Sequence, residues 1–502
     1  MAGNFHFIIT PNFASQADIL RFQHFMQDVA ELVIHKYDGS MKAEHGTGRA
    51  VAPFVEMEWG TDAYRIMKRI KHIFDPAALL NPGVILNDDR LVHVKNIKPC
   101  SVVDDLVDKC IECGFCEKTC PTSALNFSPR QRIATLREIE RLEQSGDKQA
   151  ATDMRAAAKY DVIDTCTACQ LCTIACPVDN SMGQLVRKLR TPYISTTEQK
   201  VLDFQARHFG AVNQVISSGL DVLRMVHKIG GDEMTHALMK AGRFISREVP
   251  YWNPDFPKGG KLPKPSPAKA GQETVVYFPA CGGRMFGSTP KDPDNRPLPE
   301  VIITLLERAG YNVITPAKAQ GLCCGQQWES KGDFKNADAK RQELIDAVSK
   351  MTQGGKLPVL VDALSCTYRT LTGDPAVQIM DLVEFMHDKL LPRLNISKKI
   401  DVALHLGCSA RRMKLEPKMQ AIAAACSAQV FIPAGIDCCG YAGEKGLYHP
   451  EINASALRNI KKDIPVSIKE GYYANRTCEV GLTQHSGISY RHLAYLLEEC
   501  SR

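Results

Sequence analysis

The stretch CIECGFCEKTCP at residues 110–121 decides the fold of the middle of this chain, because its pattern returns as CTACQLCTIACP at residues 166–177. Both stretches have the spacing C-x2-C-x2-C-x3-C and end on a proline. Cysteine thiolates are soft metal ligands, and an iron–sulfur cluster takes four of them. The two stretches therefore predict two [4Fe–4S] clusters.

The spacing also predicts which cysteines act together. Three sulfurs of one stretch can contact one cluster, while the cysteine beside the proline ligates the other cluster when two such motifs occur. One predicted ligand set is Cys110, Cys113, Cys116 and Cys176. The second set is Cys166, Cys169, Cys172 and Cys120. Zinc and disulfides are the alternatives, but zinc sites usually show paired C-x2-C units instead of three cysteines followed by C-P.

Composition is typical of a soluble globular protein. The 502 residues are long enough for roughly three or four domains. Hydrophobic residues make up 44% and charged residues 24% of the chain. The formal net charge of +6 is mild and no block of like charges occurs, so we expect no nucleic-acid partner.

The cysteine content indicates a reducing compartment. Nineteen cysteines in a large chain without a signal peptide favour metal ligation over a disulfide framework. No apolar window is long enough for a membrane-spanning helix, and residues 421–436 are expected to form a buried helix followed by a strand. We expect a cytoplasmic protein, with any membrane association peripheral and on the cytoplasmic face.

Pattern and composition divide the chain into five segments, which are expected at residues 1–95, 96–195, 196–271, 272–395 and 396–502. The first should contain an alternating strand (Phe5, Phe7, Ile9), two helices and a turn at residues 80–83. In the second, a helix should begin at Pro129 with Ser128 as its cap, and bury one apolar stripe.

The third segment should be helical and then extended. Six apolar residues share one face of a helix, namely Val212, Val215, Ile216, Leu220, Leu223 and Val226. That face could contact a membrane or a quinone, but internal packing is the favoured expectation. Residues 250–271 are rich in proline, glycine and lysine and are expected to form a partly extended linker.

The last 230 or so residues repeat one order of elements. In each copy a strand, a cysteine, a helix, a strand, a Cys-Cys-Gly triplet, a helix, a strand and a last cysteine follow one another. The predicted strands are 274–279, 312–315 and 358–361 in the first copy, and 401–406, 430–433 and about 472–474 in the second. Strands that alternate with helices imply parallel α/β units, whose ligands lie beyond the carboxyl ends of the strands.

The cysteines of these repeats are candidate ligands for a further iron–sulfur cluster or metal. They are Cys281, Cys323, Cys324 and Cys366 in the first copy, and Cys408, Cys438, Cys439 and Cys478 in the second. Adjacent thiols can both reach a metal when the next residue permits an unusual turn, and glycine does. Buried structural cysteines are the alternative. Three cysteines outside every motif are expected to be small hydrophobic residues or free thiols: Cys100, Cys426 and Cys500.

Polar residues near the N-terminus are weaker candidates. His6, Glu44 and His45 could supply a divalent cation site, or Glu44 could orient His45 as a base. A histidine near a strand is more often structural, so these residues alone do not predict a site.

Three stretches of the first segment resemble the C-terminal part of the FAD-linked oxidases: GNFHF (3–7), AEHGTGR (43–49) and FDPAALLNPG (74–83). Residues 96–502 resemble the iron–sulfur partner subunits of that family, with a two-cluster ferredoxin domain and two CCG domains. The whole order, and RTCEVGLTQHSG at 476–487, resembles the fused bacterial D-2-hydroxyacid dehydrogenases. The implied fold is multidomain: a partial α+β oxidase segment, a helical ferredoxin domain and a duplicated α/β cysteine-rich domain.

The resemblance implies roles for the N-terminal residues. Glu44 and His6 would bind a divalent metal beside FAD, His45 would be the general base, and Asn81 would lie near the flavin. A second metal-binding histidine of the family would fall before the first residue, and the FAD pyrophosphate-binding domain has no counterpart here. We therefore expect the FAD-binding part to be a separate subunit, or the chain to be a truncated product.

The resemblance also implies a function. The chain would be the electron-transfer portion of a dehydrogenase for D-lactate, glycolate or D-2-hydroxyglutarate, passing electrons to a quinone or another acceptor. The family's CCG motif ends in C-x2-C, whereas here Ser365-Cys366 and Thr477-Cys478 supply one cysteine each. A disulfide reductase of the heterodisulfide reductase type and a non-enzymatic metal-bearing scaffold are the alternatives.

Overall fold

The computed structural model of the protein describes residues 4–5, 7, 9, 11, 13, 15–42, 46–97, 101–245, 249–373, 377–398 and 401–501. The chain forms two compact units. The first consists of Met1–Cys113 and Leu136–Thr152, and the second of Gly114–Thr135 and Asp153–Arg502. The second unit carries both cysteine-rich repeats and most of the cluster motifs.

The first unit is built on two helices, α1 (Gln16–Glu31) and α2 (Val55–Phe74). The hydroxyl of Ser15 caps α1 by accepting a bond from the amide of Asp18 at 3.2 Å. Its small core contains Ala30, Ile34 and Phe54. Three short helical segments complete it: η1 (Leu32–Lys36), η2 (Ala52–Phe54) and η3 (Val92–Val94).

Two helices, α3 (Pro129–Gln144) and α4 (Lys148–Lys159), contribute residues to both units. The predicted start of α3 is confirmed. The amide of Gln131 donates to the Ser128 hydroxyl at 3.4 Å, while the Gln131 side chain accepts from the Ser128 amide at 2.8 Å. This reciprocal pair is a capping box, and it satisfies two of the amides that a helix start leaves free.

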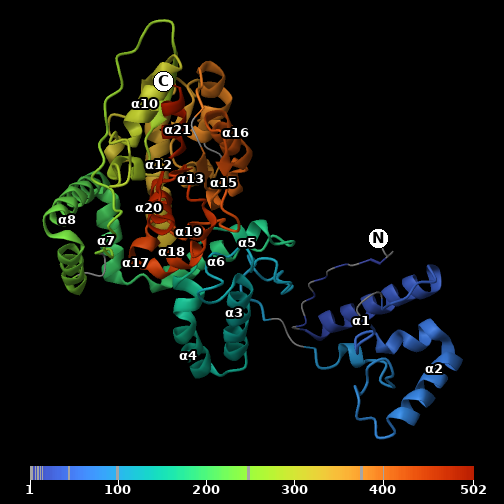
Figure 1. The fold of residues 1–502 in the computed structure, drawn as a ribbon. Helices are drawn as coiled ribbons and strands as arrows, with labels where there is room; N and C mark the ends of the chain where they lie inside the picture. Colours follow the sequence, from blue (N-terminus) through green and yellow to red (C-terminus); the bar gives the residue numbers. More distant parts are fainter. Residues whose placement is uncertain are drawn as a thin grey trace. The chain divides into compact units, whose positions relative to one another are not determined.

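The second unit continues with helices before the sheets begin. They are η4 (Tyr160–Asp164), α5 (Leu171–Ile174), α6 (Met182–Arg190), η5 (Thr191–Tyr193), α7 (Thr196–Arg207) and α8 (Phe209–Ile245). Helix α8 bends at Gly231, whose φ is 69°, and so has two arms. Figure 1 shows α7 and α8 in green on the flank of the unit that carries the two sheets.

Each cysteine-rich repeat forms a four-stranded parallel sheet. The first has the order β2-β1-β3-β4, from β1 (Glu273–Phe278), β2 (Tyr311–Ile314), β3 (Val359–Val361) and β4 (Ile379–Asp381). The second has the order β6-β5-β7-β8, from β5 (Val402–Leu404), β6 (Val430–Phe431), β7 (Glu470–Tyr473) and β8 (Ser489–His492). The two copies therefore share one topology, as the repeated order of elements predicted.

Helices cover both sheets. In the first repeat they are α9 (Cys281–Met285), α10 (Leu298–Arg308), η6 (Ala319–Gly321), α11 (Gln326–Lys331), α12 (Phe334–Ser349), α13 (Leu364–Leu371), α14 (Leu382–Phe385), η7 (Met386–Leu390) and η8 (Leu391–Arg393). In the second they are α15 (Cys408–Met413), α16 (Glu416–Cys426), α17 (Lys445–Tyr448), α18 (Pro450–Ala456), α19 (Ile460–Asp463), α20 (Arg476–Ser486) and α21 (Leu493–Cys500). Helices α10 and α21 pack against each other, so the two repeats share one hydrophobic core.

The predicted strands and helices of the repeats are confirmed within one or two residues, including the buried helix and strand expected at residues 421–436. Two strands, β4 and β8, were missed. Each is short and ends at a helix cap, Asp381 or His492, whose side chain accepts an amide of the next helix. The predicted strand near the N-terminus is wrong where it is described, because Phe5, Phe7 and Ile9 are irregular and exposed.

The predicted inward face of residues 212–226 is only partly correct. Val212, Leu220, Leu223 and Val226 are half-buried, whereas Val215 and Ile216 are 72% and 41% exposed. The rest of the second unit covers only one side of α8, so the apolar residues on the other side of this helix are exposed. Among the described residues no helix combines the length and apolar character needed to cross a bilayer.

Candidate functional site

The cysteines of the first repeat gather beyond the carboxyl ends of its strands. Cys281 follows β1 and begins α9, and Cys366 follows β3 within α13. Cys281 hydrogen-bonds to Cys323 and Cys366, and Cys324 also bonds to Cys323 and Cys366. These bonds lower the pKa of the Cys281 and Cys324 thiols well below the usual range. The fold thus brings the four predicted cysteines into one cluster.

The second repeat reproduces this arrangement. Cys408 follows β5 and begins α15, and Cys478 follows β7 within α20. The Sγ atoms of Cys439 and Cys478 lie 2.8 Å apart, and Cys438 hydrogen-bonds to Cys408 and Cys439. In both repeats the first cysteine is half-buried and the other three are buried. The duplicated topology therefore yields two equivalent thiol clusters.

The glycine of each Cys-Cys-Gly triplet has the conformation that the sequence predicted. Gly325 and Gly440 have φ values of 84° and 73°, in the left-handed region that side chains disfavour. A Cβ at Gly325 would lie 2.0 Å from the carbonyl oxygen of Ala337. At Gly440 it would lie 2.8 Å from the carbonyl oxygen of Ile452. Glycine is thus required both by the turn and by the close approach of a later helix, α12 at Gly325 and α18 at Gly440.

Backbone amides donate to several of the sulfurs. The amide of Gly325 donates to Cys323 Sγ and that of Gly440 to Cys438 Sγ, each at 3.4 Å. In the second cluster motif the amide of Ala168 donates to Cys166 Sγ, also at 3.4 Å. Amide donors stabilise negative charge on sulfur and are one means of setting the potential of an iron–sulfur centre.

The predicted ligand set of the second motif is brought together within the second unit. Burial, and then the neighbouring thiols Cys169, Cys166 and Cys120, raise the pKa of Cys172 well above its usual value. The buried guanidinium of Arg132 donates to Thr122 at 3.0 Å and to Thr165 at 3.2 Å. Since Thr122 follows the first motif and Thr165 precedes the second, Arg132 ties the two motifs to one another.

One thiol of this motif reaches the second cysteine-rich repeat. Cys169 accepts a hydrogen bond from Cys438, and this bond lowers the pKa of Cys169 to about 6 against the opposing effect of burial. This contact was not expected from the sequence, because the two cysteines are far apart in the chain and no motif links them. It places the second cluster motif directly against the second repeat.

A cavity of about 490 Å³ joins these groups. Its lining contains Cys169 together with the eight cysteines of the two repeats, Cys281, Cys323, Cys324, Cys366, Cys408, Cys438, Cys439 and Cys478. Helix α8 supplies an apolar wall through Phe209, Val212, Ile216 and Leu220. Arg187 and Arg412 add positive charge. Both thiol clusters and one cluster-motif cysteine thus open onto one largely apolar space.

Buried basic side chains hold the second motif on the repeats. Arg190 donates to the carbonyl oxygens of Cys166 at 2.6 Å and of Ser330 at 2.6 Å. Lys445 donates to the carbonyl oxygen of Asp164, and desolvation lowers its pKa to about 7. These cations surround the second motif and favour added negative charge there. A basic run after the motif, RKLR at residues 187–190, was the sequence signal that could have indicated Arg190, but no such signal marks Lys445.

The other predicted residues are placed as follows. Cys110 and Cys113 belong to the first unit, and Cys116 and Cys176 are half-buried in the second. Asn81 is exposed in the predicted turn after α2, with a φ of 43°. His6, Glu44, His45 and Cys100 lie outside the described residues. Cys426 and Cys500 are fully buried, and the Cys500 thiol donates to the carbonyl oxygen of Cys426 at 3.3 Å.

The repeats contain groups that fit an anionic cofactor. Buried Nε and Nη1 of Arg284 beside the first thiol cluster, and both ring nitrogens of His405 beside the second, have no hydrogen-bond partner among the described residues. The 2.8 Å between Cys439 Sγ and Cys478 Sγ is the spacing of hydrogen-bonded thiols, since two sulfurs on one tetrahedral zinc at about 2.3 Å would lie about 3.7 Å apart. In the described part of the chain no three His, Cys, Asp or Glu side chains form a ready metal site.

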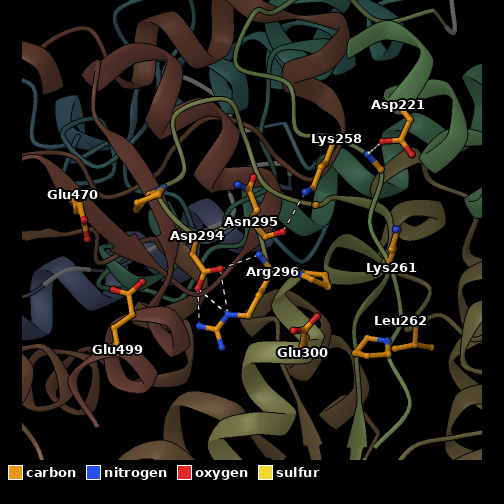
Figure 2. A pocket seen from close by; sticks show the side chains of 15 residues that line it. Asp221, Lys258, Lys261, Leu262, Asp294, Asn295, Arg296, Glu300, Glu470 and Glu499 are labelled. Atoms are coloured by element: carbon orange, nitrogen blue, oxygen red, sulfur yellow. Dashed lines mark hydrogen bonds and ion pairs between the residues drawn. The ribbon is translucent and has the colours of Figure 1, made fainter. Parts of the chain in front are cut away.

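A second pocket lies away from the thiols (Figure 2). It measures about 1130 Å³, and none of its described lining residues is a cysteine. Figure 2 shows Arg296 turned toward Asp294, with which it forms an ion pair at 2.6 Å, and Lys258 bonded to the carbonyl oxygen of Asn295 at 3.2 Å. The charged side chains Arg296, Asp294 and Lys258 of this pocket are therefore already engaged with other groups of its lining.

Comparison with protein families identifies three kinds of domain. Residues 1–85 match the family "FAD linked oxidases, C-terminal domain", and residues 106–180 match the "4Fe-4S dicluster domain". Residues 275–369 and 402–469 match the "Cysteine-rich domain". The second match confirms the prediction of a two-cluster domain from the cysteine spacing. The oxidase match confirms the resemblance of the N-terminal segment.

Comparison with curated proteins gives relatives of two kinds. The chain is 24% identical to the glycolate oxidase iron-sulfur subunit of Escherichia coli, across 79% of this chain and 94% of that subunit. It is 33% identical to the D-2-hydroxyglutarate dehydrogenase of Xanthomonas citri, but over only 16% of this chain and 17% of that enzyme. The Haemophilus influenzae D-2-hydroxyglutarate dehydrogenase is 26% identical over 35% of this chain and 22% of its own length. The chain thus spans nearly all of an iron–sulfur subunit but about a fifth of these dehydrogenases.

The thiol clusters, the paired cluster motifs and the oxidase segment agree with these matches. The chain therefore joins a FAD-linked oxidase C-terminal domain, a 4Fe-4S dicluster domain and two CCG cysteine-rich segments, and it is a homologue of the glycolate oxidase iron-sulfur subunit and of the D-2-hydroxyglutarate dehydrogenases.

Proposed function

We propose that this chain is the electron-transfer part of a flavin-dependent D-2-hydroxyacid dehydrogenase acting on glycolate, D-lactate or D-2-hydroxyglutarate. The observation that carries the proposal is the contact between Cys169 of the dicluster domain and Cys438 of the second repeat, inside the cavity that all the repeat cysteines line. When bound, [4Fe–4S] clusters accept and release single electrons. The chain holds the thiols of successive centres in contact, so electrons leave through the repeats.

The ligand assignment follows the cysteine spacing. Within the second unit Cys166, Cys169, Cys172 and Cys120 would hold one cluster, and the set of Cys110, Cys113, Cys116 and Cys176 would hold the other. The repeat cysteines would hold further iron–sulfur centres or metal. In support, Arg284 offers unpaired guanidinium nitrogens that would neutralise an anionic centre beside the first thiol cluster. His405 offers a ring N–H that would donate a hydrogen bond to a centre beside the second cluster.

A partner bearing FAD would supply the electrons. In this chain Glu44 and His6 would bind a divalent metal beside the partner's flavin. His45 would be the base, and Asn81 would lie near the flavin. The first unit leaves a surface that such a partner would cover, because large apolar side chains on and after α2 are more than half exposed: Ile66, Ile70, Ile73, Phe74, Leu79 and Leu80. A quinone is the proposed acceptor, since the cavity is walled by apolar residues of α8.

Reoxidation of the reduced chain tests this route. The anaerobic protein is reduced with dithionite, freed of excess reductant, and mixed with a water-soluble quinone while the absorbance of the clusters is followed. We expect Cys438→Ala to slow reoxidation by about tenfold or more, because it removes the thiol that touches Cys169. The iron signal of the dicluster domain, read by electron paramagnetic resonance, should remain.

Cys426→Ala is the matched control, since Cys426 is equally buried in the same repeat but belongs to no motif. Equal reoxidation rates for Cys438→Ala and the wild type would refute the route. Reoxidation by a small disulfide instead of the quinone, with release of thiols, would support the disulfide reductase alternative. A chain with bound metal that undergoes no reversible reduction would be a scaffold.

A further inference from the structure

Helix α8 presents an uncharged apolar stripe to solvent. On its first arm Val215, Val222, Met225 and Ile229 are 72%, 57%, 62% and 78% exposed. Their spacing of seven, three and four residues places them on one face. Beyond the bend at Gly231, the second arm exposes Met234, Leu238 and Phe244, of which Phe244 is 85% exposed. The two arms of α8 thus expose seven large apolar side chains, whereas the partly exposed Ile216 lies on the side that walls the cysteine cavity.

The opposite face of α8 is fixed to the protein by polar contacts. Asn213 donates to the carbonyl oxygen of Gln320 at 3.1 Å, Ser217 to that of Gly260 at 3.1 Å, and Arg224 to that of Ser288 at 3.1 Å. The helix therefore has a defined orientation on the unit. Because these hydrogen bonds fix the opposite face of the first arm, its apolar stripe faces outward.

A basic and aromatic pocket of about 300 Å³ ends the stripe. Its lining comprises His236, Met239, Lys240, Arg243, Phe244, Tyr251 and Trp252, and none of these described residues is acidic. The Arg243 guanidinium lies over the Tyr251 ring at 3.9 Å. Tryptophan, tyrosine and basic side chains beside an apolar face are the composition of helices that lie in the headgroup region of a bilayer.

Charged side chains of both signs flank the stripe. Lys200 of α7 and Lys228 and Lys240 of α8 are exposed. Two of the nearby carboxylates are engaged within the unit, because Asp221 accepts from the amide of Gly259 at 2.8 Å and Asp232 from the Trp252 indole at 3.0 Å. Helix α8 carries four basic side chains, Arg224, Lys228, Lys240 and Arg243, against three acidic ones, Asp221, Asp232 and Glu233. The preference for negatively charged lipid headgroups therefore comes from Lys240 and Arg243, which line the pocket.

We propose that the outer face of α8, with the pocket at its end, binds the surface of an anionic lipid bilayer. The same helix forms the apolar wall of the cysteine cavity through Phe209, Val212 and Ile216. Docking there brings the cavity to the lipid phase, where a lipid-soluble acceptor would reach it. The role of that acceptor rests on the proposed function, whereas the lipid-binding surface is inferred from the residues of α8 alone.

Vesicle co-sedimentation of the full, iron-loaded chain tests this. Vesicles of phosphatidylcholine with phosphatidylglycerol should bind the chain more tightly than vesicles of phosphatidylcholine alone. The double variant Val222→Glu and Ile229→Glu should bind about tenfold or more weakly, because two charges would enter the apolar layer. Arg243→Ala with Lys240→Ala should remove the preference for phosphatidylglycerol. Val466→Glu is the matched control, since Val466 is 88% exposed in the same unit but away from α8.

Three results would overturn the proposal. The first is no vesicle binding by a wild-type chain of full iron content, which would leave the proposed function intact. The second is an equal loss of binding in Val466→Glu. The third is a wild-type dimer in sedimentation velocity that the double variant splits without any vesicle binding, which would make the face an interface between copies. A chain without iron or labile sulfide would instead refute the proposed function, whatever the vesicles show.

Discussion

Arg187 of α6 and Glu329 of α11 form an ion pair at 2.7 Å, with 8% and 16% of their side chains exposed. Arg369 of α13 pairs with the other oxygen of Glu329 at 2.8 Å. One carboxylate thus joins the helix that follows the second cluster motif to two helices of the first repeat. This pairing, with Cys169 against Cys438, fixes the dicluster domain on the repeats where the centres must be close.

Removing this carboxylate should destabilise the second unit. We expect Glu329→Ala to lower the free energy of unfolding by about 3–5 kcal/mol, because the buried guanidinium of Arg187 would lose its carboxylate partner and Arg369 would keep only Asp338. Urea unfolding followed by circular dichroism measures the change. Glu138→Ala is the control, since Glu138 pairs with Arg141 where both are more than 40% exposed, and it should change stability by less than about 1 kcal/mol. Equal effects of the two substitutions would contradict the assigned role.

The triplet glycine Gly325 should tolerate no side chain. In Gly325→Ala the positive φ costs about 1–2 kcal/mol, and the clash with the Ala337 carbonyl oxygen adds to that cost. Gly310→Ala is matched, because Gly310 has a φ of 87° in the same repeat with nothing within 4 Å of its Cβ. The difference between the two unfolding free energies isolates the clash. A Gly325→Ala protein as stable as Gly310→Ala would show that the close approach is absent.

Much of this site was predictable from the sequence, because its motifs lie within short stretches of the chain. The spacing of the cluster motifs and the order of strands and cysteines act over short distances, so the parallel sheets and the left-handed glycines were predicted correctly. The contact between Cys169 and Cys438 joins segments that no periodic pattern relates. It arises from docking of whole domains, through buried residues such as Arg187 and Arg190, which single-sequence patterns do not encode.

The missed strands and the exposed helix have a similar cause. β4 and β8 are edge strands of three and four residues, too short to show an alternating pattern, and each runs directly into the helix that its last residue, Asp381 or His492, caps. For α8 the apolar periodicity was real, but periodicity cannot tell whether protein or another phase covers a face. Val215 and Ile216 therefore share the pattern of core residues but are exposed.

Protonation of His492 should weaken the fold at low pH. Burial lowers its pKa to about 3; Nδ1 accepts from the Ala494 amide, so Nε2 donates to the carbonyl oxygen of Asp362 at 3.1 Å. Below the unfolded pKa of about 6.5, the unfolded state binds a proton that the folded state refuses, so stability falls as pH falls.

The change is about 1.4 kcal/mol per pH unit for one such proton between pH 6 and pH 4. His492→Asn keeps a capping side chain without a titrating group, so its unfolding free energy should depend less on pH by this slope. Urea titrations of both proteins at several pH values measure the difference. Parallel pH profiles for the variant and the wild type would exclude His492 as the source.

Lys445 should raise the reduction potential of the second cluster motif. Its ammonium lies near Cys166 and donates to the Asp164 carbonyl oxygen, so in its charged form it stabilises the added electron. With a pKa lowered to about 7, the group is charged at pH 6. Lys445→Met should therefore lower the potential at pH 6 by tens of millivolts, since about 59 mV corresponds to about 1.4 kcal/mol in a one-electron couple.

A redox titration monitored by electron paramagnetic resonance measures this shift. Lys469→Met is the control, because Lys469 is an exposed lysine of the same repeat whose ammonium bonds only to the Val466 carbonyl oxygen among the described residues. It should leave the potential unchanged. An unshifted potential in Lys445→Met would place its charge too far from the centre to matter.

The presence of iron–sulfur clusters in this chain is decided by the iron and acid-labile sulfide content of the anaerobically purified protein, measured together with a redox titration. We expect about eight or more iron atoms per chain with matching sulfide, and reversible one-electron reduction. Zinc in place of iron, with no labile sulfide and no reversible reduction, would contradict it.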